Sequence, residues 1–411
     1  MAKEIKKRPK LRFPEFTDDW EQRKLSELTD RIIVGLATSV TPYYRETGTP
    51  LLRNMNIKEN YLDDSDILYL DNEYANSNTG KMIHENDVLT VHTGSNIGLT
   101  CVAPKKYNGS LSFTTLITTP IKEKLDSLFL MQYMNCNIGK KRIDVLITAG
   151  GKPNLNSGDL EKLEVSYPIL DEQKKIGEYF SNLDNLITLR QRELDELKEL
   201  KLGMLQKMFP KNGADVPEIR FPEFTDTWEQ RKLGDITEFV TGKSFSSELL
   251  DDGSYTVMDM GAVSQEGHRI ETKRTNTYRD MLRKDDLIMP KDDIGGGLII
   301  GRTAYIPCDN KFVLGDHVYR LRFSNENGLF VHYQINSHGF RKQILPLVTG
   351  SAQLGLNSKS IQGVYIRIPS YSEQVKIGSY FQNLDNLIAL QQKELDGYKE
   401  LKKGLLQQMF C

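Results

Sequence analysis

The chain has few cysteines and no long hydrophobic run. Its four cysteines lie far apart among 411 residues and show no CxxC spacing, which disfavours a zinc site or a disulfide framework. No apolar run approaches the roughly 20 residues that a transmembrane helix needs. The basic start of the chain lacks the apolar stretch of a secretory signal. We therefore expect a cytoplasmic protein with reduced thiols and no membrane contact.

A basic excess is also lacking. The formal net charge is −2 at pH 7, whereas a protein that binds nucleic acid by itself usually carries a clear positive charge. Any role on DNA would therefore need local basic patches or partner subunits. With 38% hydrophobic residues the chain can bury cores, and its length exceeds that of one ordinary domain.

Motifs of catalysis are missing as well. Residues 241–244 read TGKS like the end of a phosphate-binding loop, but Thr237 stands where that loop needs glycine. The acidic run at 290–293 has no identifiable acidic partner for a nuclease site. The glycines at 295–297 form no dinucleotide fingerprint, and no Asn-Pro-Pro-Tyr methyltransferase motif occurs. The chain itself is expected to perform no chemistry.

Internal repetition is the strongest feature that the sequence does have. Residues 11–25, LRFPEFTDDWEQRKL, return at 219–233 as IRFPEFTDTWEQRKL, and the two tryptophans of the chain occupy matching places. Residues 172–209 return at 373–410 with most positions identical. The long stretches between these repeats scarcely resemble each other. A duplicated frame around divergent inserts predicts a two-fold scaffold that presents two different reading heads.

The repeated segments at 172–209 and 373–410 each predict a long amphipathic helix. Apolar residues recur at spacings of three and four, interrupted at Arg190 and Lys201 in the first copy and at Gln391 and Lys402 in the second. Each helix would be about 57 Å long, too long for one small domain to cover. We expect the two helices to pair as an antiparallel coiled coil, although the interruptions leave the register open. Docking of each helix onto its own head is the alternative.

The remaining segments predict α+β heads. Short apolar runs at 87–91, 99–103 and 115–118 are separated by turn residues, and runs at 286–289, 301–306 and 318–321 match them. Short helices are expected at 128–137 and 328–336. The expected domains are a first head in 1–171, a first spacer helix in 172–209, a linker and second head in 210–372, and a second spacer helix in 373–411.

These segments together resemble the specificity subunit of type I restriction-modification systems over essentially the whole chain. The resemblance rests on the twin openings, on NLDNLI at 182–187 and 383–388, and on PLLRNMNI at 50–57. It implies that each head is a target recognition domain for one half of a split, asymmetric site in double-stranded DNA. It also implies that the helices set the gap and dock two methyltransferase subunits. Those subunits and further restriction subunits would bring S-adenosylmethionine, ATP and Mg²⁺ for adenine methylation and cleavage.

The candidate DNA-binding residues are polar side chains in loops, which can reach base edges or phosphates. Ordinary turn chemistry explains most of them nearly as well. In the first head they are Arg53, Asn54, Asn56, His92, Thr93, Ser95 and Asn96, together with Lys152 and Asn154 of a glycine-rich loop. In the second head they are Lys243, Ser244, Lys291, Asp292, Asp293, Arg302 and His317, together with Ser351 and Gln353 of the equivalent loop.

The candidate partner-binding residues are apolar positions near the start of each repeated helix. They are Ile176, Phe180, Leu183, Ile187, Ile377, Phe381, Leu384 and Ile388. A different class of function stays open at this point, because two divergent heads on a coiled-coil spacer could equally be a scaffold that grips two protein ligands.

Overall fold

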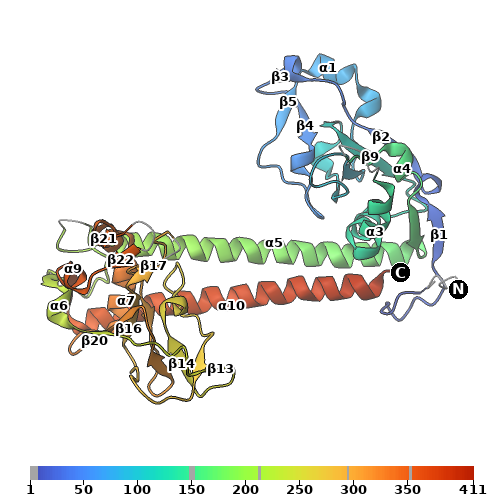
Figure 1. Cartoon of the computed structure of the whole chain (residues 1–411). Helices are drawn as coiled ribbons and strands as arrows, with labels where there is room; N and C mark the ends of the chain where they lie inside the picture. Colours follow the sequence, from blue (N-terminus) through green and yellow to red (C-terminus); the bar gives the residue numbers. More distant parts are fainter. Residues whose placement is uncertain (1–7, 148–152, 212–213, 294–295, 351–353) are drawn as a thin grey trace. The chain divides into compact units, whose positions relative to one another are not determined.

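The chain forms two units by its internal contacts. The computed structural model describes all residues except 1–7, 148–152, 212–213, 294–295 and 351–353 (Figure 1). Unit 1 comprises residues 1–192 and 393–411, and unit 2 comprises residues 193–392. Both boundaries lie inside a long helix, so each unit combines one head with one half of each long helix.

The head of unit 1 is built on two four-stranded sheets and a two-stranded ribbon. The first sheet is antiparallel, in the order β2 (Thr29–Val34), β9 (Thr115–Pro120), β6 (Val88–Val91) and β7 (Thr100–Val102). The second sheet has the order β3 (Tyr44–Arg45), β5 (Leu68–Leu70), β4 (Thr49–Arg53) and β8 (Leu111–Phe113), with β4 and β8 parallel. The ribbon pairs β1 (Glu21–Lys24) with β10 (Glu164–Tyr167).

The head of unit 2 repeats this topology strand for strand. Its antiparallel sheet has the order β12 (Thr237–Thr241), β20 (Val318–Phe323), β16 (Leu287–Pro290) and β18 (Ala304–Tyr305). Its second sheet has the order β13 (Leu249–Leu250), β15 (Arg274–Thr275), β14 (Tyr255–Met258) and β19 (Phe312–Leu314), with β14 and β19 parallel. The ribbon pairs β11 (Glu229–Lys232) with β23 (Tyr365–Ile368). A further small sheet contains β17 (Asp292–Asp293), β22 (Leu354–Leu356) and β21 (Val348–Thr349).

Three short helices correspond between the heads: α2 (Ser127–Asn135), α3 (Asn137–Leu146) and α4 (Ser157–Leu160) in unit 1 match α7 (Gly328–Asn336), α8 (His338–Ile344) and α9 (Ser358–Gln362) in unit 2. Helix α6 (Leu233–Ile236) follows β11 where unit 1 has a 3-10 turn after β1, and α1 (Asn72–Asn76) follows β5 in unit 1. Helices α2 and α7 begin in the same way, because the side chains of Asp126 and Asn327 accept hydrogen bonds from the free N–H groups of Phe129 and Phe330. The predicted α+β class and repeated heads are confirmed.

A buried carboxylate shows how one fold accommodates two sequences. Asp87 and Asp286 each precede the inner strand β6 or β16 and are about 1% exposed. Arg31 on β2 pairs with Asp87 at 3.0 Å, whereas Arg322 on β20 pairs with Asp286 at 2.6 Å. Arg31 lies opposite Thr119 in one head, and Arg322 lies opposite Glu238 in the other. The buried carboxylate is therefore neutralised in both heads, but the arginine comes from different strands. It stands on β2 in unit 1 and on β20, the counterpart of β9, in unit 2.

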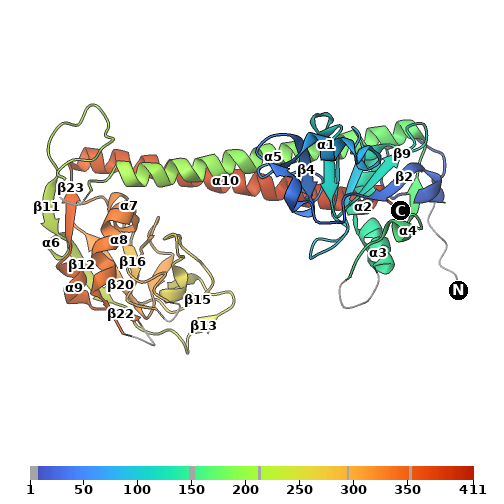
Figure 2. The ribbon, with the colours of Figure 1, turned by 90° about the horizontal axis from the view of Figure 1, so that it is seen from above.

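The two long helices are α5 (Leu170–Lys207) and α10 (Tyr371–Met409). Within each unit the halves of the two helices lie side by side (Figures 1 and 2). In unit 1, Lys402 bonds to Asp184 and Lys399 bonds to Gln191. Residue numbers rise along one helix as they fall along the other, so the predicted antiparallel pairing is confirmed within the unit.

The two lysines that interrupt the apolar pattern have partners on the opposite helix. Lys402 binds Asp184 in unit 1, and Lys201 binds Asp385 in unit 2. The four side chains are at most about one-fifth exposed. Burial raises the pKa of Asp184, and the charge of Lys402 acts in the opposite direction. These pairs select one helix register, because any slip would leave two partly buried charges alone.

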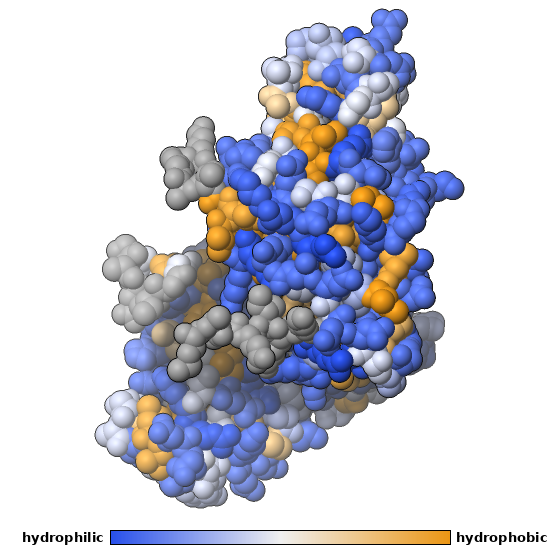
Figure 3. All heavy atoms as spheres, turned by 90° about the vertical axis from the view of Figure 1, so that its right-hand side faces the viewer, coloured by the Kyte–Doolittle hydropathy of each residue, from blue (hydrophilic) through white to orange (hydrophobic). Residues whose placement is uncertain are grey.

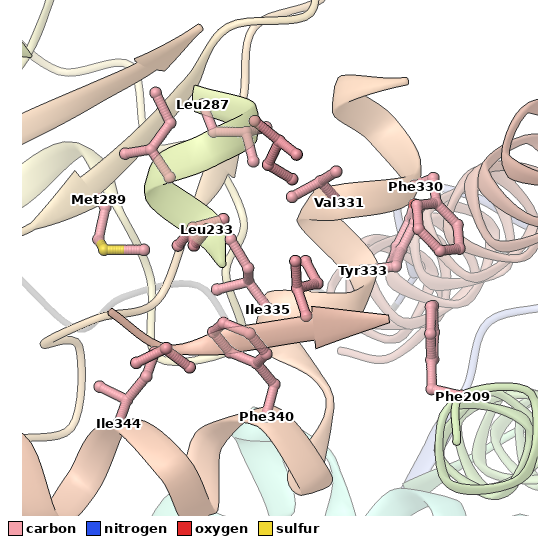
Figure 4. Close-up of a cluster of buried hydrophobic side chains, with 14 of the residues drawn as sticks. Phe209, Leu233, Leu287, Met289, Phe330, Val331, Tyr333, Ile335, Phe340 and Ile344 are labelled. Carbon is pink, nitrogen blue, oxygen red and sulfur yellow. The ribbon is translucent and has the colours of Figure 1, made fainter. Parts of the chain in front are cut away.

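Each head is completed by an aromatic residue from the end of a long helix that begins in the other unit. In unit 2, Phe209 stacks on Phe381 at 5.8 Å and contacts Phe330 and Trp228. Figure 4 shows Phe209 and Phe330 within this cluster of buried side chains. In unit 1, Phe410 takes the equivalent place in the core.

No helix among the described residues combines the length and apolar character that a membrane span requires.

Candidate nucleic-acid interface

In unit 1, three strand ends bring separate polar loops together. Asn54 follows β4, and its Nδ2 donates to the carbonyl of Thr93, after β6, at 3.2 Å and to the hydroxyl of Thr114, before β9, at 3.3 Å. Thr93 forms a β-bridge with Asn154. The N–H of Leu155 donates to the carbonyl of His92 at 3.0 Å. Four of the predicted DNA-binding residues therefore lie at one edge of the head.

Unit 2 uses the equivalent strand ends. Lys291 follows β16, and its N–H donates to the carbonyl of His317, before β20, at 3.0 Å. The carbonyl of Lys291 accepts from the N–H of Leu356 at 2.7 Å. His317 Nδ1 lies 2.8 Å from Asp292 Oδ2, and the Lys291 ammonium lies 3.2 Å from the same carboxylate. We call these two sets of residues the recognition edges: 54, 92–93, 114 and 154–155 in unit 1, and 291–292, 317 and 354–356 in unit 2.

Both recognition edges contain a backbone that is unfavourable for its residue. Thr114 has φ 52° and His317 has φ 60°, in the left-handed region. The conformation is costly above all for the β-branched threonine. The two residues occupy the same place, one position before the central strand β9 or β20. Sequence reasoning missed Thr114, because a Phe-Thr-Thr run carries no turn signal.

The two recognition edges differ in chemistry. Unit 1 presents amide, hydroxyl and imidazole groups, which can donate to and accept from base edges. Unit 2 presents a lysine, a carboxylate and a half-exposed histidine. Among the described residues no group of three or more His, Cys, Asp or Glu side chains could hold a metal ion. The arrangement suits recognition by hydrogen bonding.

Other predicted residues have internal partners. Arg53 pairs with Asp66 at 2.8 Å. Asn56 is buried, and its Nδ2 donates to the carbonyls of Asp63 and Asp66. Its amide therefore holds a loop of the head. Ser95 and Asn96 are exposed beyond β6.

The remaining predicted residues of unit 2 lie outside its recognition edge. Lys243 and Ser244 are exposed after β12, and the Ser244 carbonyl accepts from Arg279. Asp293 is buried and accepts from the N–H of Ile299 at 3.1 Å. Arg302 lines a separate cleft. Lys152, Ser351 and Gln353 lie outside the described residues.

The apolar residues predicted to bind partner subunits face the interior. Six of them are buried in the cores of their own units, and Ile187 and Ile388 are half-buried. The face drawn in Figure 3 is mostly hydrophilic, with separate hydrophobic patches. A partner that docks on the helices would therefore need the exposed positions of α5 and α10.

Comparison with known proteins agrees with the fold. The model for the type I restriction modification DNA specificity domain matches residues 17–199 and 225–398, well over half of the chain. The type I restriction enzyme MjaVIII specificity subunit of Methanocaldococcus jannaschii is 25% identical over 79% of this chain and 78% of its own length. The putative MjaX specificity subunit of the same organism is 23% identical, with 97% and 94% covered.

A solved structure has a similar fold along nearly the whole chain. The crystal structure of the type I restriction-modification S subunit from M. genitalium superposes with a TM-score of 0.66 and covers 98% of this chain and 99% of that one, at 17% identity. At 17% identity, this similarity supports a shared fold. The two matched segments of the family model each contain one head and most of one long helix. The chain belongs to the family of type I restriction-modification DNA specificity subunits.

Proposed function

We propose that each head reads one half of a bipartite, asymmetric DNA site. One observation carries the proposal: the same strand ends meet in both heads, yet they present different side chains. His92 and Thr114 stand where unit 2 has Lys291 and His317. A homodimer of one head would read a palindrome, whereas two unlike heads in one chain read two unrelated half-sites.

We further propose that α5 and α10 set the number of unread base pairs and dock two methyltransferase subunits. Each helix belongs partly to unit 1 and partly to unit 2. Exposed leucines occur at equivalent positions of the two helices, at Leu189 and Leu390 and again at Leu200 and Leu401, and each is between 43% and 53% exposed. Repeated exposed leucines favour two equivalent docking surfaces. The chain contributes recognition and assembly. The methyltransferase subunits would bind S-adenosylmethionine, and restriction subunits would bind ATP and Mg²⁺.

Mapping of methylation tests the proposal. The chain is co-expressed with a type I methyltransferase subunit in cells that lack other adenine methylation, and N6-methyladenine is mapped across the genome. A split, asymmetric motif that disappears without this chain is the expected result. A chimera whose unit 2 head comes from another specificity subunit should change one half of the motif and keep the other. A stable complex that methylates no motif would contradict the proposal and favour a protein scaffold.

A further inference from the structure

Each unit has a cleft between its head and the last part of a long helix. In unit 2 the cleft has a volume of about 560 Å³ and lies between α5 and the end of α7. In unit 1 it has a volume of about 300 Å³ and lies between α10 and the end of α2. The clefts are equivalent, because Lys198 and Lys201 line one and Lys399 and Lys402 line the other at matching helix positions.

The head side of each cleft is held in the same way. Asn336, the last residue of α7, accepts from the N–H of Thr303 at 3.1 Å and donates to its carbonyl at 3.0 Å. Asn135, the last residue of α2, makes the same two bonds to Thr100 at 3.2 and 2.7 Å. Both clefts are therefore fixed parts of the repeated fold.

Arg302 gives the cleft of unit 2 a positive charge that forms no ion pair with a described carboxylate. The side chain is half-buried, and its Nη1 donates to the carbonyl of Asn336 at 3.1 Å. Its Nε is buried and has no hydrogen-bond partner among the described residues. Burial lowers the pKa of Arg302. Two carboxylates also line this cleft: Asp385 is paired with Lys201, and Glu266 acts on Arg302 only through its charge, which raises the pKa of Arg302. The buried guanidinium of Arg341 lies close enough to add to this positive potential.

The fold does not need an arginine at this place. The equivalent residue of unit 1 is Leu99, which also stands between a left-handed glycine and the threonine bound by the asparagine. An unpaired, half-buried guanidinium is costly. A leucine at this position would avoid the free-energy cost of burying the guanidinium. This suggests that Arg302 binds an anion from outside the chain.

The helix side of both clefts is basic as well. The exposed Lys198 has no ion pair within the described part of the chain, and it stands beside the cleft that contains Arg302. In unit 1, four lysines and one carboxylate line the cleft. Three of these lysines form ion pairs: Lys140 with Glu59, Lys402 with Asp184 and Lys403 with Glu400. Among the described residues Lys399 bonds only to the neutral Gln191.

We propose that both clefts bind phosphate groups of the DNA backbone, with Arg302 and Lys198 as ligands in unit 2 and Lys399 in unit 1. The inference rests on the proposed function. A guanidinium matches two phosphate oxygens with its Nε and Nη groups, and an ammonium serves as a point charge. The recognition edges differ between the heads, but the helix lysine is the same in both. The backbone is the part of DNA that two different half-sites have in common.

The salt dependence of binding tests this inference on the complex with a methyltransferase subunit. The dissociation constant is measured for a duplex that carries the methylation motif and for a scrambled duplex, over a range of salt concentrations. Arg302→Leu should weaken both on the order of ten-fold and lower the slope of log affinity against log salt by about one. Lys198→Gln and Lys399→Gln should each lower the slope similarly. Lys393→Gln, an exposed helix lysine that lines neither cleft, serves as the control and should leave the slope unchanged.

The outcomes separate the two proposals. Arg302→Leu gives unit 2 the leucine that unit 1 has at the equivalent position, Leu99, so the melting temperature should stay the same or rise. A lower melting temperature would assign Arg302 a structural role instead. An unchanged slope and affinity, with the methylation motif intact, would overturn the phosphate sites alone. A variant that no longer assembles with the methyltransferase subunit would show that the cleft receives an acidic protein group. Absence of any motif in the parent complex would overturn the proposed function itself.

Discussion

Removal of the aromatic ring of Phe410 should destabilise unit 1 and leave unit 2 unchanged. Phe410 is 3% exposed, and its ring lies 5.5 Å from Phe129, 6.0 Å from Phe180 and 6.2 Å from Trp20. Truncation of a buried phenylalanine to alanine costs about 3–5 kcal/mol of unfolding free energy. With a urea dependence of about 2–3 kcal/mol per molar, the unfolding midpoint of unit 1 should fall by roughly 1–2 M.

The two tryptophans allow each unit to be followed separately. Trp20 lies in unit 1 and Trp228 in unit 2, and both are buried beside the aromatic residue in question. Their indole N–H groups have no partner among the described residues, so replacement by phenylalanine sacrifices no hydrogen bond. Urea unfolding of Phe410→Ala is recorded by fluorescence in a Trp228→Phe background for unit 1 and in a Trp20→Phe background for unit 2.

Matched variants make this test decisive. Phe209→Ala should lower the midpoint reported by Trp228 and spare the one reported by Trp20. Leu401→Ala, at an exposed position of the same helix as Phe410, should change stability by less than about 0.5 kcal/mol. A Trp20 midpoint that does not move in Phe410→Ala would refute the packing argument. Equal shifts at both tryptophans would refute the separate stability of the units.

Urea unfolding tests two further predictions, and the methylation motif tests a third. Gly177→Ala should destabilise unit 1, because a Cβ there would lie 2.8–2.9 Å from atoms of α2 and of its N-cap residue Asp126. Gly404→Ala meets open space and should stabilise the unit by about 0.5–1 kcal/mol through helix propensity. The opposite order of unfolding midpoints would contradict both expectations. Burial lowers the pKa of His332 to about 3, so below about pH 6.5 the unfolded chain binds a proton that folded unit 2 does not. Its stability should therefore fall by up to about 1.4 kcal/mol per pH unit as the pH drops from 6.5 to 5.5, and His332→Gln should remove most of this slope in urea titrations. Asn54→Asp should change or abolish one half of the methylation motif, and His317→Gln should change or abolish the other half. Each lost base contact should reduce the discrimination between the correct and a wrong base by about 1–3 kcal/mol. A change in the same half from both variants would contradict the assignment of one half-site to each head.

The long helices and the repeated heads could be predicted because their signals are local. Apolar residues at spacings of three and four mark α5 and α10 whatever they pack against, and two nearly equal stripes favour antiparallel pairing. Alternation and turn residues marked the strands that became β6, β7 and β9 and their counterparts. The family resemblance rested on the same repeated segments.

The recognition edges were only partly predictable. Asn54, Thr93 and Asn154 lie in separate loops of the sequence, and the sheet order brings them into contact. Asn56 has the same side chain as Asn54, yet it is buried and holds a loop. A polar side chain in a loop can bond to the backbone or face solvent, and the choice depends on groups far away in the sequence.

By itself the sequence determined the duplicated frame, the class of the heads and the length and periodicity of the helices, because these depend on side-chain type and spacing along the chain. The tertiary structure decided which charges meet. Lys402 and Asp184 are more than 200 positions apart but form one pair, whereas Arg302 is half-buried and its Nε has no partner among the described residues. The energy of a charge depends on its burial and on the distance to its counter-charge, and both quantities exist only once the chain has folded.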